Sequence, residues 1–135
     1  MRLAFAALAA ALLLPAGPVL ADECADPQDQ ASLNICAGKK FEAADRKLNE
    51  AYKKIEARLK DNPESRKMLV AAERAWVAFR DAECAFQGGP IDQAGTIRPL
   101  VVADCRTGLT EARLKDFQGY LNCEEGDMSC PVPAQ

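Results

Sequence analysis

Apolar residues recur at helical spacing in the first half of the chain. Between Gln30 and Lys60, the side chains of Phe41, Leu48 and Ile55 lie seven residues apart. Such spacing is typical of an amphipathic helix that faces a partner helix. The helix is predicted to end before Pro63, because a proline pushes the residue that precedes it out of the helical region.

Two further helices follow the first. The second is predicted from Pro63 to about Phe86 and carries Leu69, Trp76 and Phe79 at helical spacing. The third is predicted from Pro99 to about Asn122, because a proline suits the first turn of a helix. The chain therefore has the pattern of an all-α protein.

Two segments lack this periodicity. Residues Gly88–Arg98 read GGPIDQAGTIR, with three glycines and no repeat, and predict the longest loop. The tail, residues 122–135, is rich in turn-forming residues and contains two cysteines of its own. Residues 22–121 are thus predicted to form a three-helix domain, and residues 122–135 a disulfide-closed irregular tail.

A short first connection predicts an antiparallel helical hairpin with the third helix packed across it. If the hairpin turns before Pro63, residues at equal distances from the turn face one another. This register places Asp45 opposite Arg80 and Tyr52 opposite Glu73. Asp45 lies on the apolar seam of its helix, where a carboxylate needs a partner.

The Asp45 and Arg80 pair has two interpretations. An acid beside a base can form half of an active site, but the chain has no histidine and places no nucleophile beside a base. We therefore interpret the two residues as a structural ion pair, with Trp76 and Tyr52 as structural core residues. No catalytic residue and no cofactor are predicted.

The N-terminus has the pattern of a secretory signal peptide. Residues 1–21 place Arg2 before a short apolar run, followed by small residues that end at Ala21. That run is shorter than the roughly 20 residues a membrane helix needs, so no membrane insertion is expected. Cleavage near Ala21 would deliver the protein to the periplasm or to the exterior.

Cysteine usage fits an exported chain. An even number of cysteines in such a chain predicts a disulfide framework. No metal site is predicted, because histidine and the C-x-x-C spacing typical of zinc ligands are both missing. The six cysteines are Cys24, Cys36, Cys84, Cys105, Cys123 and Cys130.

The hairpin register limits how the cysteines pair. Cys36 and Cys84 would be offset by about 7.5 Å along the helix axis, beyond the Cα separation of roughly 4.4 to 6.8 Å in a bridge. Cys105 lies level with Cys84 if the third helix packs antiparallel to the second. An exchange that joins Cys24 to Cys105 needs only a modest tilt and stays open. The predicted bridges are Cys24–Cys36, Cys84–Cys105 and Cys123–Cys130.

Charge adds a weak indication of partner. Loss of Arg2 with the signal peptide leaves 16 basic and 20 acidic residues, a net charge of −4. This balance disfavours nucleic acid or an anionic membrane and favours a cationic partner, although ordinary solubility explains it equally well. Glu124, Glu125 and Asp127 form an acidic cluster that could hold a cation or meet a basic partner; a solvated turn is the preferred interpretation.

Four ordered sequence blocks resemble the LprI-type lysozyme inhibitor domain, long known as a domain of unknown function. They are Q-x-x-x-N-x-C ending at Cys36, A-D-x-x-L-N-x-x-Y over 44–52, W-x-x-F-R-D-x-x-C over 76–84 and C-x-x-x-L-T-x-x-R over 105–113. The resemblance extends from Cys24 to about Tyr120. It implies a helical disulfide-bonded domain and, for some members, inhibition of animal-type lysozyme.

The leading hypothesis is therefore a periplasmic or secreted protein that binds a cationic cell-wall hydrolase, lysozyme first, and blocks its cleft. A lysozyme cleft holds two catalytic carboxylates, and Arg98 could donate to them. The candidate partner-binding residues are Gly88, Gly89, Asp92 and Arg98. A mere connector is the competing interpretation of this loop.

The alternative function is a non-inhibitory envelope interaction or stress module with another protein partner. Inhibition assays on lysozyme and other wall hydrolases separate the two hypotheses. The sequence leaves the oligomeric state and the identity of the target open.

Overall fold

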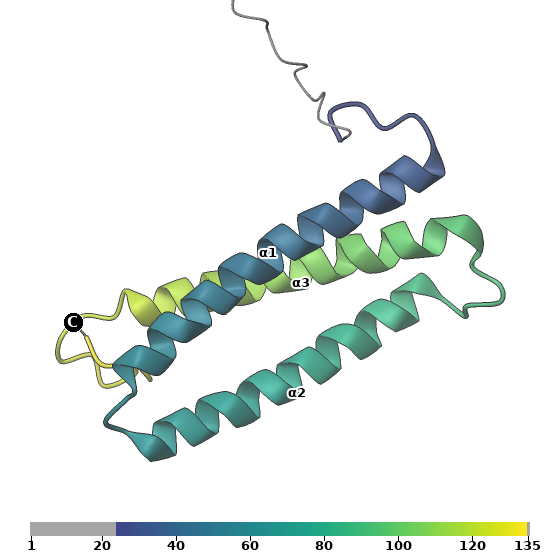
Figure 1. The fold of residues 1–135 in the computed structure, drawn as a ribbon. Helices are drawn as coiled ribbons and strands as arrows, with labels where there is room; N and C mark the ends of the chain where they lie inside the picture. The colour runs from purple at the N-terminus through teal and green to yellow at the C-terminus, as the bar shows by residue number, and fades with distance from the viewer. Residues whose placement is uncertain (1–23, 135) are drawn as a thin grey trace, which may run out of the picture.

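The computed structural model describes residues 24–134, and these form three α-helices without a strand (Figure 1). The helices are α1 (Gln30–Arg58), α2 (Pro63–Gly88) and α3 (Arg98–Leu121), with a single 3-10 turn, η1 (Gly95–Ile97), before α3. The predicted all-α fold class is confirmed. Each helix begins and ends within two residues of its predicted bounds.

Local capping explains where the first two helices begin. The Asp29 carboxylate accepts a hydrogen bond from the backbone N–H of Ser32 at 2.7 Å and so caps α1. The Asn62 side chain accepts from the N–H of Ser65 at 3.0 Å and caps α2, whose first residue is Pro63. Both caps satisfy backbone donors that have no partner inside the helix.

The third helix holds the hairpin together. α3 packs against both other helices and most closely against α1, whereas the backbones of α1 and α2 diverge from their shared turn (Figure 1). α2 turns Glu73 and Arg80 towards the interior of the hairpin, and the apolar seam of α1 is buried mainly against α3, with Leu69 and Trp76 of α2 packed beside it. The predicted third helix across the hairpin is thus the centre of the fold.

The core lies between α1, α3 and the end of the tail. Partly buried Tyr52 and Trp76 pack against it, as expected for core residues. Phe79, which shares the helical spacing of Trp76, is 54% exposed and lies outside this core. The buried core residues are Leu48, Ala51, Ile55, Leu59, Phe117 and Val132.

All three predicted disulfides are present. The first ties the N-terminal segment to α1, the second joins α2 to α3, and the third closes the irregular tail. Their Cα separations are 5.4, 5.5 and 6.0 Å, within the usual range. The pairs are Cys24–Cys36, Cys84–Cys105 and Cys123–Cys130.

The predicted signal peptide, residues 1–21, lies outside the described residues. Within 24–134, no helix is both long enough and apolar enough to cross a membrane.

Candidate partner-binding site

The loop between α2 and α3 lies at the end of the bundle opposite the C-terminal tail (Figure 1). Three contacts fix it. The Cys84–Cys105 disulfide joins the helices on either side, the Arg98 Nε donates to the Gly89 carbonyl at 3.0 Å, and the Asn34 Nδ2 donates to the Thr96 carbonyl at 3.0 Å. The loop is therefore anchored to all three helices.

Two of the predicted binding residues shape this loop. Gly88 is buried at the end of α2, and a Cβ atom there would lie 2.5 Å from Val102 Cγ2. Glycine thus allows the end of α2 to approach α3 closely. Gly89 has a φ of +73°, a left-handed conformation that favours glycine and turns the chain out of the helix.

The other two differ in exposure. Arg98 is half-buried, and its Nε is occupied by the Gly89 carbonyl, so this side chain closes the base of the loop. Asp92 is exposed near the tip. The four predicted residues therefore lie in one loop, with Asp92 the most open to a partner and Gly88 the least.

Sequence reasoning missed the apolar part of this surface. Ile91 is 81% exposed beside Asp92, and Phe86 is 82% exposed on the last turns of α2. Ile97 and Ile35 are 51% and 53% exposed at the same end. Large exposed apolar side chains at the end of the bundle that holds the loop are candidates for contact with a partner. The signal available in the sequence was Ile91, a large apolar residue in a glycine-rich loop.

The predicted ion pair lies away from the loop, in a groove of about 310 Å³ between α1 and α2. Arg80 Nη1 lies 3.3 Å from Asp45 Oδ1, the contact that the register predicts, and Arg80 Nε lies 3.0 Å from Asp81 Oδ1. The guanidinium also lies over the Trp76 and Phe41 rings, 5.1 and 5.2 Å from their centroids. The buried cation is therefore compensated on several sides.

A second ion pair closes the same groove. Arg113 of α3 donates from Nε to Glu73 Oε1 at 2.8 Å, and both side chains are 15% exposed. Burial alone would lower the pKa of Arg113, but the hydrogen bond and charge of Glu73 outweigh it and raise the pKa. Tyr52 lines the groove with Glu73, and its pKa is raised by burial and then by the Glu56 carboxylate. These partners mark the groove as structural.

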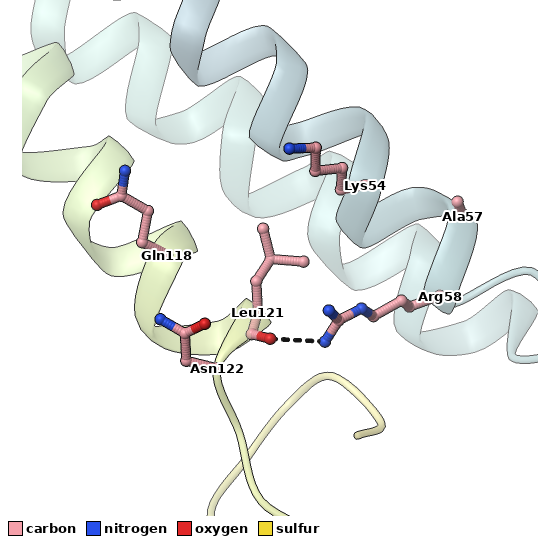
Figure 2. Close-up of a pocket in the computed structure, with 6 residues that line it drawn as sticks. All are labelled: Lys54, Ala57, Arg58, Gln118, Leu121 and Asn122. Atoms are coloured by element: carbon pink, nitrogen blue, oxygen red, sulfur yellow. Dashed lines mark hydrogen bonds between the residues drawn. The ribbon is translucent and has the colours of Figure 1, made fainter. Parts of the chain in front are cut away.

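Another hollow, of about 620 Å³, opens where the ends of α1 and α3 meet (Figure 2). Figure 2 shows Arg58 pointing to the end of α3, where its Nη1 donates to the Leu121 carbonyl at 2.7 Å. Carbonyls in the last turn of a helix lack internal partners, so this contact caps α3. Lys54 and Gln118 also line the hollow.

The acidic cluster of the tail forms a turn. Asp127 Oδ1 accepts from the Ser129 hydroxyl at 2.6 Å and from its backbone N–H at 2.9 Å. These hydrogen bonds lower the pKa of the Asp127 carboxyl. Glu124 and Glu125 are exposed beside it, and no group of three potential metal ligands is found within residues 24–134.

Comparison with known proteins agrees with the resemblance of the four blocks. The family model described as "Lysozyme inhibitor LprI" matches residues 21–117, which include the whole of α1 and α2 and most of α3. An uncharacterized protein of Rhizobium meliloti (strain 1021), R02472, is 29% identical over 114 residues, covering 76% of this chain and 81% of the relative. No solved structure matches the chain significantly. The chain belongs to the LprI lysozyme inhibitor family.

Proposed function

We propose that the protein binds a cationic cell-wall hydrolase, lysozyme first, and inhibits it by inserting the loop at residues 89–97 into the substrate cleft. The family name implies a lysozyme inhibitor role. The three disulfides and the family together indicate an extracytoplasmic protein. Inhibition by occupation of a cleft needs no catalytic group in the inhibitor.

The exposure of Ile91 on an anchored loop is the observation that carries this proposal. Both ends of the loop are fixed by Arg98 and by the Cys84–Cys105 disulfide, so little conformational entropy is lost on binding. Ile91 supplies an apolar anchor at 81% exposure, and Asp92 lies next to it. The net negative charge of the chain would hasten encounter with a basic enzyme.

A titration of lysozyme with the mature, oxidised protein tests the proposal. Inhibition should rise in proportion to the amount added and level off near a simple molar ratio. Ile91→Asp should weaken it by about tenfold or more, because the variant places a charge in the buried centre of the interface. Met128→Asp is the matched control, since Met128 is 97% exposed at the opposite end.

Equal inhibition by the Ile91→Asp variant would refute the assignment to the loop. Binding to lysozyme without loss of its activity would instead favour the envelope interaction module. Turnover of a wall fragment by the purified protein alone would contradict both.

A further inference from the structure

The C-terminal tail folds back onto the end of the bundle where α1 turns into α2 (Figure 1). Of residues 124–134, only Val132 is buried, at 2% exposure. Its side chain belongs to the core cluster with Ile55 and Leu59 of α1 and Phe117 of α3. One valine is therefore the main apolar contact between the tail and the core.

Polar contacts add little to the hold of the helices on the tail. Within residues 124–134, the N–H and O–H groups that form hydrogen bonds donate to other residues of the tail. The N–H of Asp127 donates to the Glu124 carbonyl and that of Cys130 to the Asp127 carbonyl, while Ser129 donates twice to the Asp127 carboxylate. In the described part of the chain, no ion pair joins these residues to a helix.

Hollows surround the contact of the tail with the bundle. One of about 600 Å³ lies between the tail and α3, and another of about 710 Å³ lies between the tail and the turn at Asn62. Val132 also forms part of the wall of a third hollow, of about 420 Å³. All three helices line this third hollow, mainly with apolar side chains that include Ile55, Leu59, Met68, Leu69 and Tyr120. Withdrawal of Val132 would therefore expose buried parts of the core to solvent.

The disulfides differ in how far a reductant can reach them. Cys36 is 6% exposed and Cys84 is 0% exposed, so each of the other two bridges contains one buried cysteine. Cys123 and Cys130 are both partly exposed. Reduction requires a thiolate to reach a disulfide sulfur, and the thiolate that leaves is unfavourable in an apolar interior. The tail bridge is therefore the one that a reductant should open first.

We propose that the Cys123–Cys130 disulfide is a redox-sensitive latch that holds the tail on the bundle. A dithiol reductant opens it by supplying two electrons and two protons. The two thiols of the reductant join as a disulfide, and the bridge between Cys123 and Cys130 becomes two cysteine thiols. The other two bridges stay closed. The tail then leaves the bundle, Val132 leaves the core, and the hollow of about 420 Å³ opens.

Release of the tail follows from the entropy of the segment. The bridge fixes Cys130 two residues before Val132 and so limits the freedom that the tail gains when it detaches. Without the bridge, burial of one valine must offset the ordering of the whole segment 123–131, which is the larger contribution. Oxidation closes the latch again, because the two thiols stay seven residues apart in the chain.

The latch acts far from the proposed inhibitory surface. The loop at residues 89–97 lies at the opposite end of the bundle (Figure 1). Reduction should therefore open the tail without moving Ile91, and the proposal is independent of lysozyme inhibition.

Limited reduction tests which bridge opens first. The mature, oxidised protein is treated with dithiothreitol under native conditions, the free thiols are alkylated with iodoacetamide, and the labelled peptides are mapped. Cys123 and Cys130 should be labelled about tenfold or more faster than the other four cysteines, because access limits the reaction. Labelling of either other bridge at an equal or higher rate would overturn the proposal.

A dye that fluoresces on apolar surface, anilinonaphthalene sulfonate, tests whether the tail opens. The form alkylated at Cys123 and Cys130 should bind more dye than the oxidised parent, and its melting temperature should fall by about 5 to 10 °C. Val132→Ser should bind more dye with its bridge closed, because it removes the apolar contact directly. Met128→Ser is the matched control, since Met128 is 97% exposed in the same tail, and should behave like the parent.

Dye binding unchanged by selective reduction would overturn the proposal. So would a Val132→Ser variant that binds no more dye than Met128→Ser, because Val132 would then not be what closes the hollow.

Discussion

Arg80 of α2 forms an ion pair with Asp45 of α1, with its Nη1 atom 3.3 Å from the carboxylate oxygen Oδ1. The two side chains differ in exposure: Arg80 is 9% exposed and Asp45 is 38% exposed. The buried member of the pair is therefore the cation, and the carboxylate supports it from the rim of the groove. Asp81 and the rings of Trp76 and Phe41 complete its surroundings.

This arrangement predicts the effect of removing the rim carboxylate. Asp45→Ala leaves a buried guanidinium with Asp81 as its remaining acid, so the free energy of unfolding should fall by about 1 to 2 kcal/mol. The loss is less than the 3 to 5 kcal/mol typical of a stranded buried charge. Asp45→Asn, which keeps a hydrogen-bond acceptor, is the control and should lose less. Urea unfolding measures the free energy of unfolding of both variants. An Asp45→Ala variant as stable as the parent would show that the pair does not support the hairpin.

The sequence predicts the helix bounds well because local chemistry decides them. Asn62 and Pro63 define the first turn, and the register from that turn disfavours a Cys36–Cys84 bridge. Cys84 and Cys105 could be paired because an antiparallel packing of α3 on α2 brings them to the same level. The inward face of α2 is harder to predict, because the helix carries apolar residues all round its circumference. Trp76 faces the groove while Phe79, three residues later, faces away. Periodicity alone does not tell which arc faces the core.

The same limit applies to the candidate site. The loop could be located from its glycines, but the roles of its residues depend on tertiary contacts. Arg98 looks like an available donor in the sequence, yet its Nε is occupied by the Gly89 carbonyl. Exposure of Ile91 follows from how the loop is anchored, which spacing along the chain does not encode.

Gly88 should tolerate no larger residue. In Gly88→Ala the new Cβ would lie 2.5 Å from Val102 Cγ2, and relief of that clash requires Val102 to leave its rotamer or α2 and α3 to move apart. We expect a loss of about 1 to 3 kcal/mol in the free energy of unfolding, typical of overpacking. Gly108→Ala is the matched control, because no atom lies within 4 Å of its added Cβ. Gly108 lies inside α3, where alanine is more favourable than glycine, so this variant should be more stable than the parent by about 0.5 to 1 kcal/mol. Thermal melts of both variants measure the contrast; equal shifts would contradict it.

Tyr52 should make stability fall at alkaline pH. Burial and then the Glu56 carboxylate raise its pKa above 10.0, so the folded state favours the neutral phenol. The corresponding stabilisation is complete below pH 10 and is lost as the pH rises through the folded pKa. Tyr52→Phe lacks this titration, so the parent should lose stability relative to the variant between about pH 10 and 12. Unfolding by urea at several pH values measures this; a constant difference between the two proteins would contradict it.

The disulfide that joins α2 to α3 should matter for both stability and inhibition, whereas the disulfide of the tail should matter for stability alone. Replacing Cys84 and Cys105 together with alanine opens a loop with a sequence separation of 21 and should lower the free energy of unfolding by about 3 kcal/mol. It also frees one anchor of the loop that carries Ile91, so the variant should inhibit lysozyme less well under conditions where it is fully folded.

The matched control replaces Cys123 and Cys130, whose separation is 7, and should lose about 2 kcal/mol. Because that bridge lies at the opposite end of the bundle, the control should inhibit like the parent. Circular dichroism melts and lysozyme titrations at a temperature below both transitions measure the two effects, and equal inhibition by both folded variants would show that the anchored loop is not the inhibitory surface.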